Sequence, residues 1–103
     1  MGYGWSKHAK EELAKGHTIE VSPRGNSMTP KIKSGQKIRL EPLGDRVVKK
    51  GAIVFCKVNG NEYVHLVTAI RNNGESVQIS NNHGHVNGWT NKKNIFGIVT
   101  KVY

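Results

Sequence analysis

The dipeptide Asn59-Gly60 constrains the fold more than any other feature of this sequence. A type I′ hairpin turn needs positive φ at both central residues, and Asn followed by Gly accepts that conformation readily. The residues on either side, 52–58 and 62–70, are rich in β-branched and apolar side chains. Such runs are typical of strands, so the sequence predicts an antiparallel hairpin at its centre.

Glycine and asparagine mark further turns along the chain, and short strands are expected between them. The 103 residues suffice for one domain. We expect an N-terminal arm (1–18) and a β domain (19–103), mainly β and built as small bent antiparallel sheets or a partly open barrel. A short helix over residues 7–15, capped by Ser6 and ended by Gly16, carries few apolar residues and is expected to lie on the surface or fray. The other predicted strands are 17–21, 37–40, 76–80 and 95–103, with a long polar loop over residues 81–94.

Positive charge is spread along the chain. Sixteen Lys and Arg residues against seven acids give a net charge of +9. They occur in twos and threes, without a basic helix or the interleaved aromatic residues that stack on bases. Solvation of the surface is the favoured interpretation, and binding to nucleic acid is the alternative.

Cys56 is the single cysteine and lies in an apolar run, so we expect a buried, inert thiol. A chain without an internal disulfide fits the cytoplasm, and neither an export signal nor a membrane-spanning apolar stretch is evident. His65, His83 and His85 lack Cys or carboxylate partners at metal-binding spacing. We therefore predict no metal and no cofactor.

Ser27 lies in the string Gly-Asn-Ser-Met-Thr-Pro at residues 25–30. Thr29 and Pro30 are expected to begin one helical turn, which places the serine in a sharp loop. Backbone N–H groups of such a loop can stabilise an oxyanion. Because serine is also common as a cap before a turn, this string alone leaves a structural role open.

His65 lies on the predicted return strand and shares a face with Tyr63 and Val67. A lone strand histidine is usually half-buried and bonded to a backbone carbonyl. Where the fold brings it to a serine, the neutral imidazole can take the hydroxyl proton near neutral pH.

Taken in order, the Ser-Met-x-Pro string, Val64-His65-x-Val67, the Asn81-Asn82 loop and the closing Phe-Gly-Ile-Val resemble the signal-peptidase and LexA-repressor superfamily of serine peptidases. The resemblance covers roughly residues 19–102. It implies that Ser27 is the nucleophile and His65 the general base, in the histidine variant of this superfamily. Asn26 and Met28 are expected to support the loop, Met28 by burying its side chain.

Three positions depart from the superfamily pattern. Asn81 stands where an aspartate is usual in the histidine variant, Gly25 replaces a small hydroxyl residue, and Leu66 replaces an arginine. Asn81 is expected to hold the imidazole tautomer but to stabilise its charge less than a carboxylate would. We therefore expect a soluble, free-standing peptidase, of the kind found in phages or plasmids, that cleaves a peptide or protein substrate or itself. An inactive protein-binding module of the same fold is the alternative.

Overall fold

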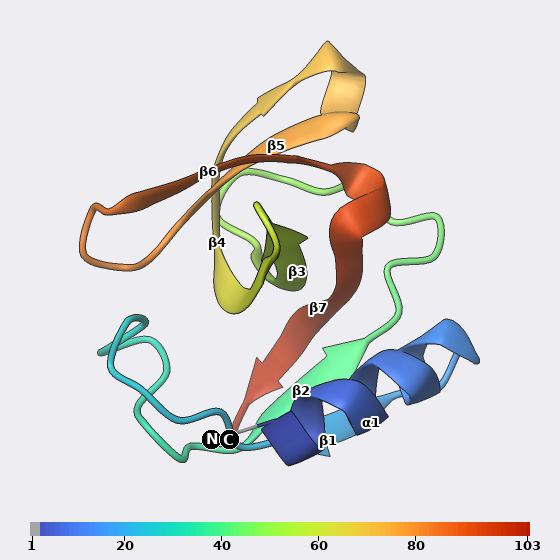
Figure 1. Cartoon of the computed structure of the whole chain (residues 1–103), viewed down its shortest axis with the longest axis vertical. Helices are drawn as coiled ribbons and strands as arrows, with labels where there is room; N and C mark the ends of the chain where they lie inside the picture. Colours follow the sequence, from blue (N-terminus) through green and yellow to red (C-terminus); the bar gives the residue numbers. More distant parts are fainter. Residues whose placement is uncertain (1–2) are drawn as a thin grey trace.

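A computed structural model describes residues 3–103, and within them one helix is followed by seven strands in a single open antiparallel sheet. The strand order is β1-β2-β7-β3-β4-β5-β6 (Figure 1). The elements are α1 (Tyr3–Ala14), β1 (Ile19–Val21), β2 (Ile38–Glu41), β3 (Ile53–Val58), β4 (Asn61–Arg71), β5 (Ser76–Ser80), β6 (Val86–Asn91) and β7 (Ile95–Val102), with 3-10 turns η1 (Asn72–Gly74) and η2 (Lys92–Asn94).

The central hairpin forms as predicted. Strands β3 and β4 pair antiparallel from Val58–Asn61 to Ile53–Leu66. Asn59 has φ of 50° and Gly60 has φ of 85°, the positive values that a type I′ turn requires. The mainly β fold with one N-terminal helix is therefore confirmed, and the strands form one open sheet where several small sheets or a partly open barrel were expected.

The predicted polar loop over residues 81–94 is wrong in its second half. Val86–Asn91 is strand β6, which pairs antiparallel with β5 at the edge of the sheet. Its sequence, VNGWTN, lacks the alternation of apolar and polar residues that identifies a half-buried strand. The residues form a strand because they pair with β5, although their own strand propensity is weak.

Strand β3 divides the apolar core because both of its faces are buried. Val54 and Cys56 lie in one cluster with residues of β4 and β5, while Phe55 lies in a second cluster with residues of α1 and β2. Burial raises the pKa of the Cys56 thiol to about 12, which keeps it protonated and unreactive as expected.

Helix α1 packs more firmly than the sequence indicated. Ala9 is 0% exposed and Leu13 is 4% exposed, and both belong to the cluster around Phe55. A Cβ at Gly97 would come within 3.0 Å of the Leu13 side chain, so glycine allows the helix to approach β7 closely. The prediction of a surface or frayed helix was wrong because two well-placed apolar residues suffice to anchor it.

The ends of α1 agree only partly with the predicted ones. Gly16 ends the helix as expected, with φ of 85°, and the N–H of His17 donates to the Glu12 carbonyl. Ser6 is not the N-cap, because the helix already includes it, and its hydroxyl donates to the Glu62 carboxylate. Ser6 therefore ties the helix to the start of β4.

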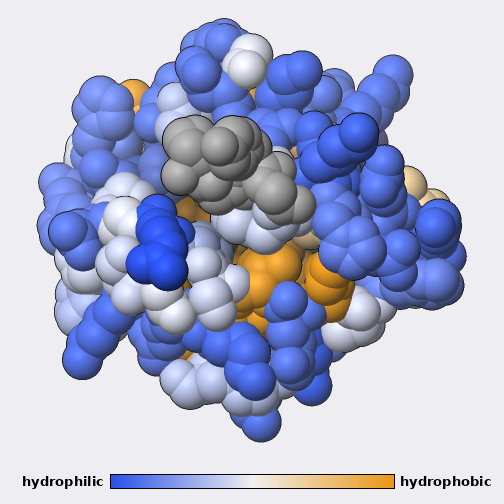
Figure 2. Space-filling view, turned by 60° about the horizontal axis from the view of Figure 1, so that its bottom comes forward, coloured by the Kyte–Doolittle hydropathy of each residue, from blue (hydrophilic) through white to orange (hydrophobic). Residues whose placement is uncertain are grey.

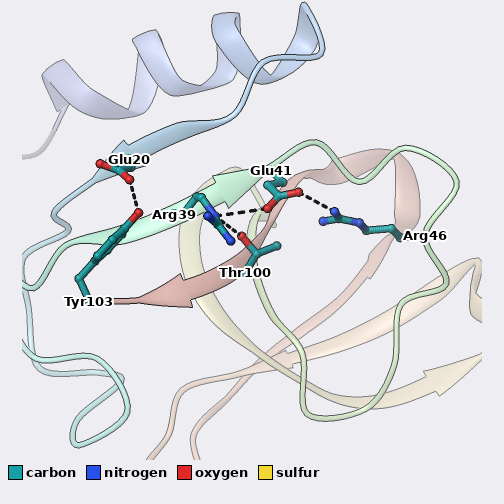
Figure 3. Close-up of polar contacts among 6 residues, drawn as sticks. All are labelled: Glu20, Arg39, Glu41, Arg46, Thr100 and Tyr103. Atoms are coloured by element: carbon teal, nitrogen blue, oxygen red, sulfur yellow. Dashed lines mark hydrogen bonds and ion pairs between the residues drawn. The ribbon is translucent and has the colours of Figure 1, made fainter.

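Polar contacts cross strands β1, β2 and β7 on the outer side of the sheet (Figure 3). Arg39 Nε donates to Thr100 Oγ1 at 2.9 Å and lies 3.3 Å from Glu41 Oε2, and Arg46 pairs with the other oxygen of the Glu41 carboxylate at 2.6 Å. Exposed ion pairs of this kind add little stability each.

On the face seen in Figure 2, hydrophilic residues cover most of the surface and apolar surface gathers near the centre.

Candidate active site

The loop that carries Ser27 follows strand β1 and is anchored by Met28, which is 4% exposed and packs in the cluster around Phe55. The single turn predicted at Thr29 and Pro30 is present but does not become a helix: residues 27–31 form turns, and the N–H of Ile32 donates to the Met28 carbonyl at 3.0 Å. Gly25 has φ of 117°, a value that favours glycine at this bend. The loop thus leaves Ser27 exposed beside a buried neighbour.

Ser27 and His65 meet across the fold as predicted. The Ser27 Oγ atom lies 3.0 Å from His65 Nε2, although 38 residues separate them in the sequence. His65 projects from β4, is 6% exposed, and stacks against the Tyr63 ring with the ring centroids 4.7 Å apart. The distance is that of a nucleophile and its base in hydrogen-bond contact.

Asn87 supplies the third polar group, which sequence reasoning assigned to Asn81. The Asn87 Oδ1 atom lies 2.7 Å from His65 Nδ1. The Oδ1 atom of Asn81 instead accepts hydrogen bonds from the N–H groups of His83 and His85, so Asn81 shapes its own loop. The expected role of Asn81 in holding the imidazole is therefore corrected to Asn87.

A β-bulge explains why Asn87 reaches the histidine. The β5–β6 register passes from Ile79–Gly88 to Ser80–Val86 and leaves Asn87 without a partner across the ladder. Bulges bend a strand and redirect a side chain, and they are frequent beside active sites. The Asn-Gly pair at residues 87–88 was the available sequence signal, but it lay within the stretch predicted as a loop.

The two contacts of the imidazole fix its tautomer. Because Asn87 Oδ1 accepts a hydrogen bond, the Nδ1 atom carries the proton and Nε2 has a free lone pair toward Ser27. Burial lowers the pKa of His65 below its ordinary value of 6.5, and the nearby His85 lowers it further, while the Asn87 hydrogen bond partly offsets the shift. His65 is therefore neutral at pH 7, the form that accepts a proton.

The loop after β5 holds the Ser27 loop by hydrogen bonds. The N–H of Asn82 donates to the Ser27 carbonyl at 2.8 Å, and the Asn82 Nδ2 donates to the Thr29 carbonyl at 3.0 Å. His83 Nε2 lies 3.0 Å from the Asn26 carbonyl oxygen. Asn26 and Met28 thus support the loop as expected, and Asn82 and His83 add contacts that the sequence did not predict.

Within residues 3–103, the Ser27 loop has backbone N–H groups without a protein acceptor. Among the described residues, neither the Ser27 nor the Met28 N–H donates a hydrogen bond to another protein group. Unpaired amides beside an exposed nucleophile can stabilise the negative oxygen of a tetrahedral intermediate.

A cavity of about 560 Å³ opens beside Ser27 and His65, between α1, the Ser27 loop and the first half of β4. Its volume lies within the range of pockets that bind small molecules and peptide side chains. Strand β4 pairs with β5 only from Leu66 onward, so residues 61–65 have no strand on that side. The cavity thus adjoins both Ser27 and a stretch of strand without a partner on one side.

Residues 3–103 contain no group of three His, Cys, Asp or Glu side chains arranged to hold a metal ion. His83 turns toward Asn26 and Thr29 instead. None of the helices described over that range is long and apolar enough to cross a membrane.

Comparisons with protein-family models, curated proteins and solved structures find no match for this chain.

Proposed function

We propose that this protein is a serine peptidase in which Ser27 is the nucleophile, His65 the general base and Asn87 the residue that orients the imidazole. The observation that carries the proposal is the 3.0 Å contact between Ser27 Oγ and His65 Nε2, with the histidine buried and neutral. The bent β fold is proposed to be of the LexA and signal-peptidase type, on the motif resemblance at Ser27 and His65.

The reaction follows from this arrangement. Ser27 Oγ attacks the peptide carbonyl carbon while its proton passes to His65 Nε2, and the carbonyl electron pair moves to oxygen. The N–H groups of Ser27 and Met28 stabilise that oxyanion. As the C–N bond breaks, the imidazolium returns the proton to the leaving amine. Water, deprotonated by His65, then hydrolyses the acyl-enzyme and releases the acid with Ser27 restored.

A peptide is the substrate class that the unpaired part of β4 favours. Residues 61–65 carry backbone N–H and C=O groups on the side without a strand neighbour, next to Ser27. An extended peptide can pair with such an edge as an added strand, which gives affinity through main-chain hydrogen bonds.

The amide of Asn87 bears on the expected rate of peptide hydrolysis. An amide oxygen orients the ring as a carboxylate does, but it carries no charge to stabilise the imidazolium formed during attack. We therefore expect slow turnover, of the kind suited to a single processing event.

Labelling with a fluorophosphonate probe tests the proposal, because the probe phosphonylates an activated serine. The native protein should be labelled at Ser27, whereas Ser27→Ala and His65→Gln should not be labelled. Ser22→Ala and His8→Gln are matched controls at exposed positions outside the cavity and should label as the native protein does. Absence of labelling in the folded native protein would contradict the proposal.

A second candidate is a catalytically idle protein-binding module. It is favoured by Asn87 in the place of a carboxylate. This candidate predicts that the Ser27→Ala and His65→Gln proteins retain full affinity for the partner and full biological effect. Loss of partner affinity and biological effect in both variants would exclude it.

A further inference from the structure

Helix α1 forms one wall of the cavity beside Ser27. Trp5 packs on Phe55 with their ring centroids 5.1 Å apart, and both side chains line the cavity. Met28, Ile32 and Val64 complete an apolar lining. A volume of about 560 Å³ lined in this way fits a bulky apolar side chain together with part of the main chain that carries it.

Ser6 and Lys10 hold this wall in place. Lys10 Nζ lies 2.6 Å from Glu62 Oε2, and the Ser6 hydroxyl donates to the other oxygen of that carboxylate. Glu62 is the carboxylate that lines the cavity, and these two contacts satisfy it. The helix is thereby fixed to the strand edge at which a peptide would add.

Two cations at the cavity stay unpaired. Lys7 on α1 and Arg24 on the Ser27 loop line it, and among residues 3–103 no carboxylate lies within ion-pair distance of either. Because Lys10 offsets Glu62, the cavity presents a net positive charge. An acidic group beside the bound apolar side chain would meet these cations without competition from the protein's own acids.

We propose that this cavity is a specificity pocket that selects peptides with a bulky apolar residue flanked by Asp or Glu, and that Trp5 is its specificity-determining residue. The proposal rests on the proposed peptidase function and names its substrate class. The unpaired edge at residues 61–65 favours a peptide over a small ester, because a peptide can bond the edge and fill the cavity together.

Equilibrium binding to the Ser27→Ala protein tests the pocket without requiring turnover. Four fluorescent octapeptides would be compared by anisotropy, with Phe or Ala at the centre and with Glu or Lys on both sides of it. The Phe peptide with Glu should bind about tenfold or more tightly than either the Ala peptide or the Phe peptide with Lys. Equal affinities for all four peptides would overturn the proposal.

Two sets of variants locate the selectivity. Trp5→Ala should remove the preference for Phe over Ala, and the milder Trp5→Leu serves if the first variant does not fold. Lys7→Glu with Arg24→Glu should reverse the preference for Glu over Lys. The matched control, Lys49→Glu with Lys50→Glu, makes the same change in net charge at exposed residues outside the cavity and should leave the preference unchanged. If the control lost the preference for Glu over Lys to the same extent, the preference would come from the overall charge of the protein, and the proposal would be refuted.

The two proposals can fail separately. Probe labelling of Ser27 without peptide discrimination would refute the specificity pocket and leave the peptidase standing. Discrimination without labelling would refute the peptidase and retain the pocket as a peptide-binding site.

Discussion

His65 Nδ1 lies 2.7 Å from Asn87 Oδ1, and Asn87 is the residue that the β5–β6 bulge leaves unpaired. The bulge therefore places an amide where an acid would complete a Ser-His-acid triad. The contact fixes the ring and its tautomer without adding a charge.

Asn87→Asp should raise the pKa of His65 by about one to two units, because a carboxylate in contact favours the imidazolium. Hydrolysis should become faster for the same reason. The pKa can be followed by NMR of the ring protons. Asn81→Asp is the matched control, since Asn81 bonds loop N–H groups and not His65, and it should leave that pKa nearly unchanged. An equal shift in both variants would contradict the assigned role of Asn87.

The pH dependence should reflect the buried histidine. Because burial lowers the pKa of His65 below 6.5, the acid limb of kcat/KM should have its midpoint below pH 6.5. In the same window the unfolded chain binds more protons than the folded one, so stability should rise with pH up to about 6.5. Urea titrations of the native and His65→Gln proteins from pH 4.5 to 7.5 check this, and a shallower slope is expected for the variant. Identical slopes would contradict it.

The hydrogen bond from Asn82 to the Ser27 loop should affect the reactivity of the Ser27 hydroxyl. Asn82→Ala removes the bond to the Thr29 carbonyl and should cost about 1 kcal/mol of stability and slow probe labelling of Ser27. Asn94→Ala removes a similar bond, 3.0 Å long, to Thr90 and should cost a similar amount without slowing labelling. Equal labelling rates in the two variants would show that Asn82 contributes stability alone.

The close approach of α1 to β7 can be measured at Gly97. A Cβ at this position would lie 2.9 Å from the Glu41 carbonyl oxygen and 3.0 Å from Leu13, so Gly97→Ala should destabilise the protein by about 1–3 kcal/mol. The φ of Gly97 is not positive, so the cost is steric. An unchanged urea midpoint would mean that the helix does not pack as described.

The central hairpin could be predicted from sequence because its signal is local. Asn59-Gly60 and the runs beside it determine the pairing and place His65 on the correct face. Ser27 could be paired with His65 only through the order of motifs, since nothing local relates two residues 38 positions apart.

The rest of the site depends on tertiary contacts. Asn87 lies on a strand of weak pattern and reaches His65 only through a bulge, which no propensity encodes. Helix α1 becomes a wall of the cavity because Leu13 packs against Gly97 and Glu62 binds Ser6 and Lys10, all of them contacts between distant segments.

Peptide-bond hydrolysis by Ser27 can be measured directly. The native protein would be incubated with a diverse peptide library in ¹⁸O-labelled water, and new C-termini would be identified by mass spectrometry. Cleavage is expected with one ¹⁸O incorporated at each new C-terminus, reduced by about a thousandfold or more in Ser27→Ala and retained in Ser22→Ala. Cleavage that persists in folded Ser27→Ala, or no cleavage by the native protein, would contradict it.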